Sequence, residues 1–532
     1  MPQVRNILFI MCDQLRNDYL SCYGHPVLKT PNIDALAARG VLFNRAYVQS
    51  PICGPSRMST YTGRYVISHG STWNGVPLKV GEYSLGDYLR PLGMRVAVTG
   101  KTHMTPDTEG MTRLGIDPQS LIGVHVSQCG FEPYDRYDGV HPDGLRERPR
   151  YSDYLQSKGY DGSNPWDRWA ASGEDDEGRI VSGFFMRHAS RQARVEESDS
   201  ETPYVTSRAM DFIAETGERP WCLHLSYIKP HWPYIAPAPY HNMYGAADVI
   251  PALRSPNERV DPHPIYKSFM NERVSRVFSR DDVRETVIPV YMGLIKQIDD
   301  QIGRLTEFLE RQGRLKDTLI VFTSDHGDYL GDHWLGEKEL FHDVSVRVPL
   351  IVVDPSPAAD KARGTACDAL VEMIDLAPTF LDVLGADIPH HRLEGRSILP
   401  LLRGESPSGW RQYVISEYDY SLRLARSDYD VPIQDCHMTM LADERWSYIY
   451  APDFPPLLFD RQTDPNEFTD LGRDSAHENV RQLMKRRLLE WSTRLRQRTT
   501  IDDATIGRRF GKEADFGILI GFWDEDEPKA YI

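Results

Sequence analysis

The sequence predicts an α/β fold: a large mixed, mainly parallel sheet sandwiched by helices, followed by a smaller C-terminal α+β domain with an antiparallel sheet. Short continuous apolar runs, helical periodicity between them and short strand candidates late in the chain predict this arrangement. The 532 residues are 40% hydrophobic and 26% charged. That composition is ordinary for a folded globular protein and excludes a collagen-like, coiled-coil or generally disordered chain.

Four apolar runs end in polar residues that can carry chemistry. The runs cover residues 6–11, 95–99, 221–227 and 319–323, and they lead into Asp13-Gln14, Lys101 and His103, His231, and Asp325-His326. Continuous rather than alternating apolar runs are typical of parallel strands that are buried on both faces. Because ligands bind beyond the carboxyl ends of such strands, four distant segments are expected to meet at one site.

Helices are predicted between these runs, at residues 32–40, 84–92 and 286–313. In the longest, apolar residues recur at helical spacing, at Val290, Leu294, Ile298, Ile302 and Leu305. The segment 138–202 is rich in Gly, Asp, Glu, Arg and Ser and shows little periodicity. We interpret it as a surface insertion that shapes the entrance of the site.

The pattern changes near residue 405, which divides the chain into a catalytic domain at 1–405 and a smaller domain with a tail at 406–532. Strand candidates at 413–416, 438–441 and 446–450 are separated by polar turns, and a helix is predicted at about 476–498. The last segment, 510–532, mixes apolar and acidic residues. It is either a surface tail or an arm that reaches a neighbouring subunit, and we expect a homo-oligomer.

The charge balance restricts the partners. Lys and Arg total 61 against 77 Asp and Glu, a formal charge of −16, which argues against binding to nucleic acid or anionic membranes. No stretch approaches the roughly 20 apolar residues of a membrane span, and residues 1–11 hold too short an apolar run for a secretory signal. A cytoplasmic location is therefore predicted, and the seven cysteines, which form no CxxC pair, are expected to be reduced thiols.

Two of the strand ends together predict a metal site. Asp13, Gln14, Asp325 and His326 offer two carboxylates, an amide oxygen and an imidazole. Oxygen-rich sites suit Ca²⁺, Mg²⁺ or Mn²⁺, and the imidazole and amide shift the preference towards a transition ion. One divalent ion is expected, with Mn²⁺ favoured and Ca²⁺ as the alternative.

Cys53 begins a second pattern, Cys53-Gly54-Pro55-Ser56-Arg57. Proline is favoured in the first turn of a helix, which would set Cys53 at the positive end of the helix dipole, where thiols become acidic. A buried structural cysteine before a helix is the alternative. A phosphatase-type cysteine loop is excluded, because it needs more than the three residues found here between Cys53 and Arg57.

These residues resemble the type I sulfatases of the alkaline phosphatase superfamily, in which CxPSR followed by TGR marks a cysteine that is oxidised to formylglycine (3-oxoalanine). Thr62-Gly63-Arg64 supplies the second part of this signature. The resemblance implies an alkaline-phosphatase-like fold, a maturation enzyme that oxidises Cys53, and a metal ion held by the four residues above. It extends through the segments at 30–34, 100–103, 229–231, 324–327, 337–338, 458–460 and 463–467.

The departures from the family pattern refine the resemblance. Many sulfatases carry two adjacent acidic residues after the first strand and Asp-Asn after the later one, and both pairs differ here. With the segment at 73–77, these differences resemble the branch of arylsulfatases close to bacterial phosphonate monoester hydrolases. In the phosphonate enzymes, however, the positions of Lys101 and His103 tend to be Tyr and Thr, so here the sulfatase-like residues are kept.

The resemblance also implies roles for the site residues. The anionic oxygens of sulfate and phosphonate esters repel nucleophiles, so an enzyme must neutralise charge, present a strong nucleophile and protonate the leaving oxygen. One hydroxyl of hydrated formylglycine would attack, and the second would break the covalent intermediate. Arg57 would orient the formylglycine, and Lys101 and Lys338 would bind the nucleophile or the transferring group. His103 would take the proton of the second hydroxyl, and His231 would protonate the leaving oxygen. Asn74 would add a hydrogen-bond donor to the substrate anion.

We therefore predict a metal-dependent formylglycine hydrolase of small aryl sulfate monoesters, with side activity on phosphonate monoesters and phosphodiesters. The alternative reverses which activity is primary. Lys101 and His103 favour the first reading, whereas Gln14, His326 and Asn74 keep the second open. A noncatalytic metal-binding protein on the same scaffold would lack one of the central residues, and none is missing.

Overall fold

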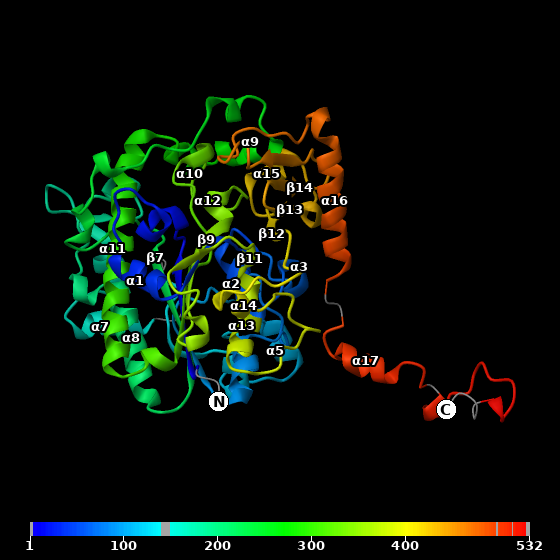
Figure 1. Cartoon of the computed structure of the whole chain (residues 1–532). Helices are drawn as coiled ribbons and strands as arrows, with labels where there is room; N and C mark the ends of the chain where they lie inside the picture. Colours follow the sequence, from blue (N-terminus) through cyan, green and yellow to red (C-terminus); the bar gives the residue numbers. More distant parts are fainter. Residues whose placement is uncertain (1–3, 140–148, 496–497, 513, 528–532) are drawn as a thin grey trace.

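The computed structural model describes residues 4–139, 149–495, 498–512 and 514–527. Of the predicted insertion at 138–202, residues 140–148 lie outside the described residues. The described chain forms a large sheet covered by helices on both faces, a smaller sheet beside it, and an arm that leaves the body at the C-terminal end (Figure 1).

The large sheet of the described residues has nine strands and is mixed but mainly parallel. Their order is β10-β2-β9-β8-β1-β7-β3-β4, with β11 paired to β2. Only β9 runs antiparallel to its neighbours, β2 and β8. The strands are β1 (Asn6–Asp13), β2 (Val41–Tyr47), β3 (Arg95–Gly100), β4 (Glu132–Arg136), β7 (Trp221–Pro230), β8 (Thr318–Ser324), β9 (Arg347–Val353), β10 (Thr365–Cys367) and β11 (Val371–Glu372).

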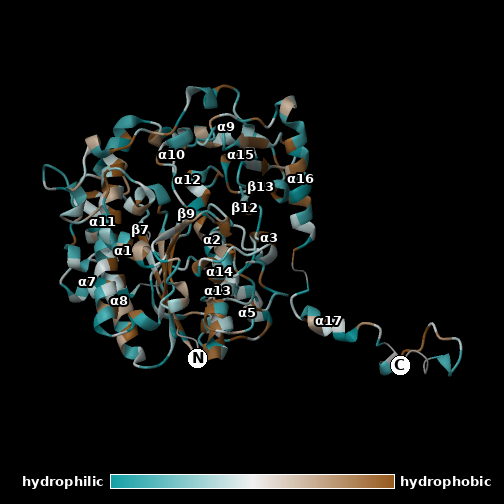
Figure 2. Cartoon of the chain, in the orientation of Figure 1, coloured by the Kyte–Doolittle hydropathy of each residue, from teal (hydrophilic) through white to brown (hydrophobic). Residues whose placement is uncertain are grey.

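Strand β1 explains why the apolar runs are continuous. It lies between β7 and β8, and all eight of its residues are buried. Alternate side chains enter two different cores, one on each face of the sheet: Ile7, Phe9 and Met11 in one, Leu8, Ile10 and Cys12 in the other. A strand buried on both faces needs apolar residues at every position, and Figure 2 shows brown strands at the centre of the fold.

Helices cover both faces of the large sheet (Figure 1). One core is closed by α1 (Pro31–Arg39), α8 (Glu201–Thr216) and α11 (Asp281–Arg311), and the other by α2 (Cys53–Thr62), α4 (Leu85–Leu89) and α13 (Leu376–Val383). Helix α11 begins five residues before the predicted position, where Asp281 and Asp282 suit the positive end of the helix dipole. No helix of the described chain combines the length and the apolar character that a bilayer crossing requires.

The remaining helices and one hairpin are short and lie around these layers. The hairpin pairs β5 (Ser172–Glu174) with β6 (Ile180–Ser182) inside the predicted insertion. The helices are α3 (Val66–His69), α5 (Thr108–Arg113), α6 (Leu121–Val126), α7 (Arg150–Ser157), α9 (Pro264–Asn271), α10 (Arg273–Phe278), α12 (Asp343–Val346), α14 (Leu399–Leu402) and α15 (Leu424–Asp428).

The C-terminal part contains the predicted antiparallel sheet, in the order β12-β13-β14-β15. Helix α16 (Glu478–Thr493) packs on it through Met484 and Trp491, while α17 (Asp503–Arg509) lies outside the body (Figure 1). The predicted fold class is confirmed, and a domain boundary near residue 405 stays a prediction. The four strands are β12 (Val414–Asp419), β13 (His437–Ala442), β14 (Trp446–Tyr450) and β15 (Leu457–Asp460).

Candidate active site

The predicted strand ends meet at one edge of the large sheet. Since β1 lies between β7 and β8, Asp13 at its end pairs in register with Pro230, and Cys12 pairs with Ser324. Strand β3 flanks β7, and the backbone N–H of Lys101 donates to the carbonyl of Ser226 at 3.1 Å. The N-terminus of α2 brings Cys53 to the same edge, so all five segments converge.

Two buried carboxylates are joined by one buried arginine. The Arg57 guanidinium donates from Nη2 to Asp13 Oδ2 (3.1 Å) and from Nε to Asp325 Oδ2 (2.8 Å), and all three side chains are 0% exposed. Lys101 Nζ lies 2.5 Å from Asp13 Oδ2. Burial opposes ionisation of Asp13, but Lys101 and the neighbouring cations outweigh it and hold the pKa of Asp13 well below its usual value. Asp325 differs from Asp13, because burial and the neighbouring Asp13 carboxylate raise the pKa of Asp325 despite its contact with Arg57. The site therefore holds one firmly ionised carboxylate, Asp13, matched by fixed cations.

Cys53 lies among these charges at the first position of α2. Its Sγ atom is 3.1 Å from His326 Nε2, 3.4 Å from Lys338 Nζ and 3.7 Å from Asp13 Oδ1. Burial and the Asp13 carboxylate oppose ionisation of the thiol. The cations of Lys101 and Lys338 outweigh both, and the pKa of Cys53 is well below its usual value.

The buried cluster fits a divalent cation. Asp13, Cys53, Asp325 and His326 each offer one ligand atom, and these atoms lie within 4.8 Å of one another. His326 Nδ1 donates to the carbonyl of Gly327 (2.8 Å), which turns Nε2 towards the cluster, where it lies 3.1 Å from Cys53 Sγ. Two carboxylates and one imidazole are a suitable donor set for Mn²⁺ or Ca²⁺.

Gln14 lies at the edge of this cluster. Its backbone N–H donates to Asp325 Oδ1 (3.0 Å), and its side-chain Oε1 accepts from Lys338 Nζ (3.0 Å). Its Nε2 donates to Asp328 Oδ2 (2.5 Å), which fixes the orientation of the amide. The amide oxygen therefore faces the same side as the Cys53 thiol.

The predicted substrate-side residues line one cavity of about 310 Å³, here called the active-site cavity. Asp13, Gln14, Arg57, Asp325 and His326 are fully buried behind it. The structure thus brings together every residue proposed for the site. The proposed site residues that line the cavity are Cys53, Asn74, Lys101, His103, His231 and Lys338.

Three of the lining residues keep a side-chain group available. Asn74 Oδ1 accepts from the backbone N–H of Gly54 (2.8 Å), which leaves its NH₂ group as a donor. His231 Nδ1 donates to the carbonyl of Trp232 (2.8 Å), and its Nε2 is 3.9 Å from Asp13 Oδ1. His103 Nδ1 is buried and has no hydrogen-bond partner among the described residues.

Several residues that support the site have no signature in the sequence. Ser226 Oγ accepts from Arg57 Nη1 (2.8 Å), and Asp138 Oδ1 accepts from the backbone N–H of His103 (3.1 Å). Asp328, which holds the Gln14 amide, follows His326 by two residues, and burial raises its pKa to about 6. Arg423 reaches the cavity from the C-terminal part. In the cavity wall it forms an ion pair with Glu339. Ser226, inside the predicted run 221–227, and Asp328, two residues after His326, lie close enough to predicted motifs to have been found.

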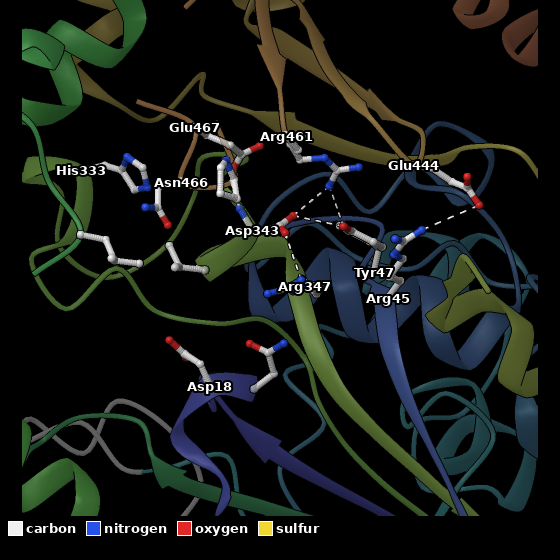
Figure 3. A pocket seen from close by; sticks show the side chains of 14 residues that line it. Asp18, Arg45, Tyr47, His333, Asp343, Arg347, Glu444, Arg461, Asn466 and Glu467 are labelled. Carbon is white, nitrogen blue, oxygen red and sulfur yellow. Dashed lines mark hydrogen bonds and ion pairs between the residues drawn. The ribbon is translucent and has the colours of Figure 1, made fainter. Parts of the chain in front are cut away.

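A second cavity of about 300 Å³ lies between the large sheet and the C-terminal part (Figure 3). Its size does not distinguish it from the active-site cavity, but its charges do. Asp343 pairs with Arg461 (3.1 Å) and Arg347 (3.3 Å), and Arg45 pairs with Glu444 (3.8 Å). Because its own acids neutralise its arginines, it offers an anionic ester less than the cavity at Cys53 does.

A group beside the second cavity also offers metal-ligating atoms, from Glu258, His333 and His342. The two imidazoles stack with centroids 3.7 Å apart and planes 4° apart. Ring nitrogens hold their lone pairs in the ring plane, so parallel stacked rings do not point at a common ion. His333 Nδ1 instead bonds Glu258 Oε1 at 2.6 Å.

Comparison with known proteins identifies the family of the chain. The model of the sulfatase family matches residues 5–386. The chain belongs to the sulfatase family. A second model, described as the C-terminal part of N-sulphoglucosamine sulphohydrolase, matches residues 331–494, which include the small sheet. Membership of this family, within the alkaline phosphatase superfamily, confirms the predicted enzyme class, an ester hydrolase of the sulfatase type.

Relatives of this sulfatase-family chain carry several names. The multifunctional alkaline phosphatase superfamily protein PehA of Trinickia caryophylli is 31% identical over 92% of this chain and 95% of its own. An arylsulfatase of Clostridium perfringens is 26% identical over 88% and 90%. The structure of a phosphonate monoester hydrolase from Silicibacter pomeroyi superposes with a TM-score of 0.81 at 30% identity, covering 93% of this chain and 96% of that one.

Proposed function

We propose that this sulfatase-family protein is a metal-dependent formylglycine hydrolase of aryl sulfate monoesters, with side activity on phosphonate monoesters and phosphodiesters. One observation carries the proposal: Cys53 lines a cavity while its Sγ atom lies within 3.7 Å of Asp13, His326 and Lys338. A nucleophile beside fixed cations and a metal-type donor set is what hydrolysis of an anionic ester requires.

Charge neutralisation comes from the lysines. Lys101 and Lys338 both line the active-site cavity, and Arg57 lies buried directly behind it. Because Lys101 and Arg57 pair with Asp13 and Asp325, the site would become positive towards an anionic ester when a divalent ion adds its charge to these cations, in a chain whose net charge is −16. Preorganised donors of this kind are worth most where water is excluded.

The reacting groups follow from the same geometry. Cys53, once oxidised to formylglycine, would supply the attacking hydroxyl, and Arg57 would orient it. Asp13, Asp325 and His326 would hold the divalent ion together with Gln14. When bound, such an ion lowers the pKa of a hydroxyl and polarises a substrate oxygen.

Two histidines would move protons. His231 would deliver a proton from Nε2 to the leaving oxygen, and the free Nδ1 of His103 would accept the proton of the second hydroxyl. Burial lowers the pKa of His231 well below its usual value. The negative charge of a bound ester would raise it again, because a nearby anion favours the protonated imidazole. The NH₂ group of Asn74 would donate to the transferring group.

In a second candidate function, hydrolysis of phosphonate monoesters and phosphodiesters is the main activity and hydrolysis of sulfate esters is the side activity. Gln14 and His326 depart from the common sulfatase pattern, and structures that resemble this chain include phosphonate monoester hydrolases. The deciding experiment measures kcat/KM on matched aryl sulfate, phosphonate monoester and phosphodiester substrates, with fully modified protein of known metal content. We expect the sulfate ester to give the highest value. A phosphonate monoester in first place would make the second candidate the function.

The proposal includes the partners of the enzyme. A maturation enzyme that oxidises Cys53 would act before the chain closes around it, since Cys53 is 1% exposed in the folded protein. We also propose a homo-oligomer, because the C-terminal arm carries exposed apolar side chains outside the body (Figure 1). The cytoplasmic location stays a prediction.

A further inference from the structure

A third cavity adjoins the active-site cavity and is larger, at about 750 Å³. Phe184, Trp232, Pro233 and Glu337 line both cavities, so the two share this wall. The rest of the third cavity is formed by the loop after β6, by α10 and by the first turns of α11. In Figure 1, the label of α10 lies above and to the right of that of α11.

The third cavity has more apolar than polar lining, and five charged side chains also reach it: Arg187, Arg273, Arg280, Asp282 and Glu337. Phe185 is 66% exposed and adds apolar surface to the wall of this cavity. An apolar surface that remains open beside a reaction site is typical of a binding groove. The apolar and aromatic side chains that line the cavity are those of Phe184, Phe185, Met186, Trp232, Pro233, Tyr234, Val274, Val277 and Val283.

The shared wall lies on the leaving-group side of the active site. Trp232 directly follows His231, and their rings are 4.2 Å apart, while the other neighbour of Trp232 is Phe184, at 5.8 Å. In the proposed function, His231 donates the proton to the leaving oxygen. A leaving group that extends past His231 would therefore meet Trp232 first and the third cavity next. The buried Nε1 of Trp232 has no hydrogen-bond partner in the described chain and remains a donor.

We propose that the third cavity is a leaving-group subsite that takes the apolar part of an alkyl-substituted or otherwise extended aryl ester. This inference rests on the proposed function, because that function sets the ester group at Cys53 and its leaving oxygen at His231. It narrows the substrate class from small aryl esters to esters of extended hydrophobic phenols.

The test is a series of 4-alkylphenyl sulfates from methyl to hexyl, whose leaving groups have nearly the same basicity. In the native enzyme, kcat/KM rises about two- to fourfold per methylene until the cavity is filled, because each buried CH₂ contributes a constant transfer free energy. In Val277→Glu, which puts a charge among the apolar side chains, the rise disappears. Val277→Leu keeps it, and so does the matched control Val260→Glu, a change at an exposed valine outside both cavities.

A flat series in the native enzyme, or an unchanged rise in Val277→Glu, overturns the subsite. A change of oligomeric state in Val277→Glu with an unchanged rise would assign the cavity to contact between copies and overturn it as well. Calorimetric titration with 4-alkylphenols separates the subsite from the proposed function, since it needs no turnover. An affinity for the phenols that rises with chain length supports the subsite even if no ester is hydrolysed. A lack of ester hydrolysis would contradict the proposed function and leave the subsite standing.

Discussion

Cys53 combines burial with strong local charge, which a cysteine used only for packing does not need. The contrast with Cys222 is direct, because burial raises the pKa of that thiol and no nearby cation opposes it. We predict that the Cys53 peptide of the active enzyme is about 18 mass units lighter than the thiol form, since oxidation to an aldehyde replaces SH₂ by O. Mass spectrometry of the digested protein measures this.

The same prediction has a functional arm. Cys53→Ser should lose at least about 10³-fold in kcat, because without the nucleophile only binding and electrostatics remain. Cys367→Ser, at the edge strand β10, is the matched control and keeps full activity. An unmodified thiol in protein of full specific activity would rule out the aldehyde.

The two aspartates are expected to determine metal content. Asp13→Asn and Asp325→Asn each remove one negative charge from a donor set that also faces buried Arg57. Bound metal and activity should fall together, about 10-fold or more, whereas Gln14→Ala should be milder because it removes a neutral donor. Metal analysis of the purified variants measures the loss.

The stability of each variant should be measured as well, because each change removes one of the two carboxylates that pair with buried Arg57, and breaking a buried ion pair costs about 3–5 kcal/mol. Asp343→Asn in the second cavity (Figure 3) is a matched control, and it should leave the metal content unchanged. Full metal content in both site variants would show that the two strand ends do not form one metal site.

The role of His231 can be separated from simple binding. A proton donor matters in proportion to the basicity of the leaving group, and such transfer contributes about 10²- to 10⁴-fold. We predict that His231→Ala slows esters of poor leaving groups far more than nitrophenyl esters, so the plot of log kcat/KM against leaving-group pKa becomes steeper. Metal content should not change. An equal loss for all leaving groups would assign His231 to binding, and Lys338 or His103 would become candidates for the acid.

At the scale of single elements, β12 carries a half-buried carboxyl group, that of Glu417, which no ion pair offsets in the described part of the chain. The Glu417 carboxylate accepts hydrogen bonds from the backbone N–H of Ile67 at 3.1 and 3.3 Å. Burial raises its pKa from 4.5 to about 8, and Glu394 and Glu372 add to the rise. The folded protein therefore holds a proton at Glu417 that the unfolded chain has released.

This difference predicts a pH dependence of stability with a definite sign. Because the folded state binds the extra proton, the free energy of unfolding should fall as pH rises from about 4.5 to about 8. Glu417→Gln should flatten this part of the profile and raise stability at pH 8, by on the order of 1–3 kcal/mol. Urea unfolding at several pH values measures both. Glu405→Gln, at an exposed position, should follow the native profile, and a native slope retained in Glu417→Gln would contradict the assignment.

The elements also show how far the sequence alone can lead. The runs at 6–11, 95–99, 221–227 and 319–323 predicted four central strands, because strands buried on both faces are apolar throughout. Strand β2 was missed, since it interrupts its apolar run with half-buried Asn44 and Arg45. Strand β9 was missed as well, and its antiparallel direction depends on partners distant in the chain rather than on its own residues.

The same limit applies to the site. Residues at strand ends could be predicted because the strand and the chemical group are adjacent in sequence. Arg423 and Trp166 could not, because they reach the active-site cavity from the C-terminal part and from the insertion, where no local pattern marks them. Tertiary packing brings these two residues to the cavity, and the sequence of a single segment does not reveal such packing.

For the whole molecule, the C-terminal arm is the feature that the monomer does not explain. Beyond α16 the chain leaves the body, and α17 and the following residues extend outward (Figure 1). Four large apolar side chains there are nearly bare: Phe510 is 88% exposed, Phe516 72%, Ile520 93% and Trp523 91%. Burying such a side chain contributes roughly 1.5–3 kcal/mol, so together they could hold two copies of the chain against each other.

We predict that the arm joins subunits of a homo-oligomer. The native chain should elute with a mass that is a multiple of 60.8 kDa, measured by light scattering after gel filtration. The triple variant Phe516→Ser, Ile520→Ser, Trp523→Ser should run as a monomer, because it removes most of the apolar surface that docking would bury. Leu121→Ser with Ile122→Ser, on α6 of the body, removes equally exposed side chains, at 73% and 65%, and should leave the mass unchanged. A native mass of 60.8 kDa at micromolar concentration, or an oligomer that survives the triple variant, would show that the arm does not hold subunits together.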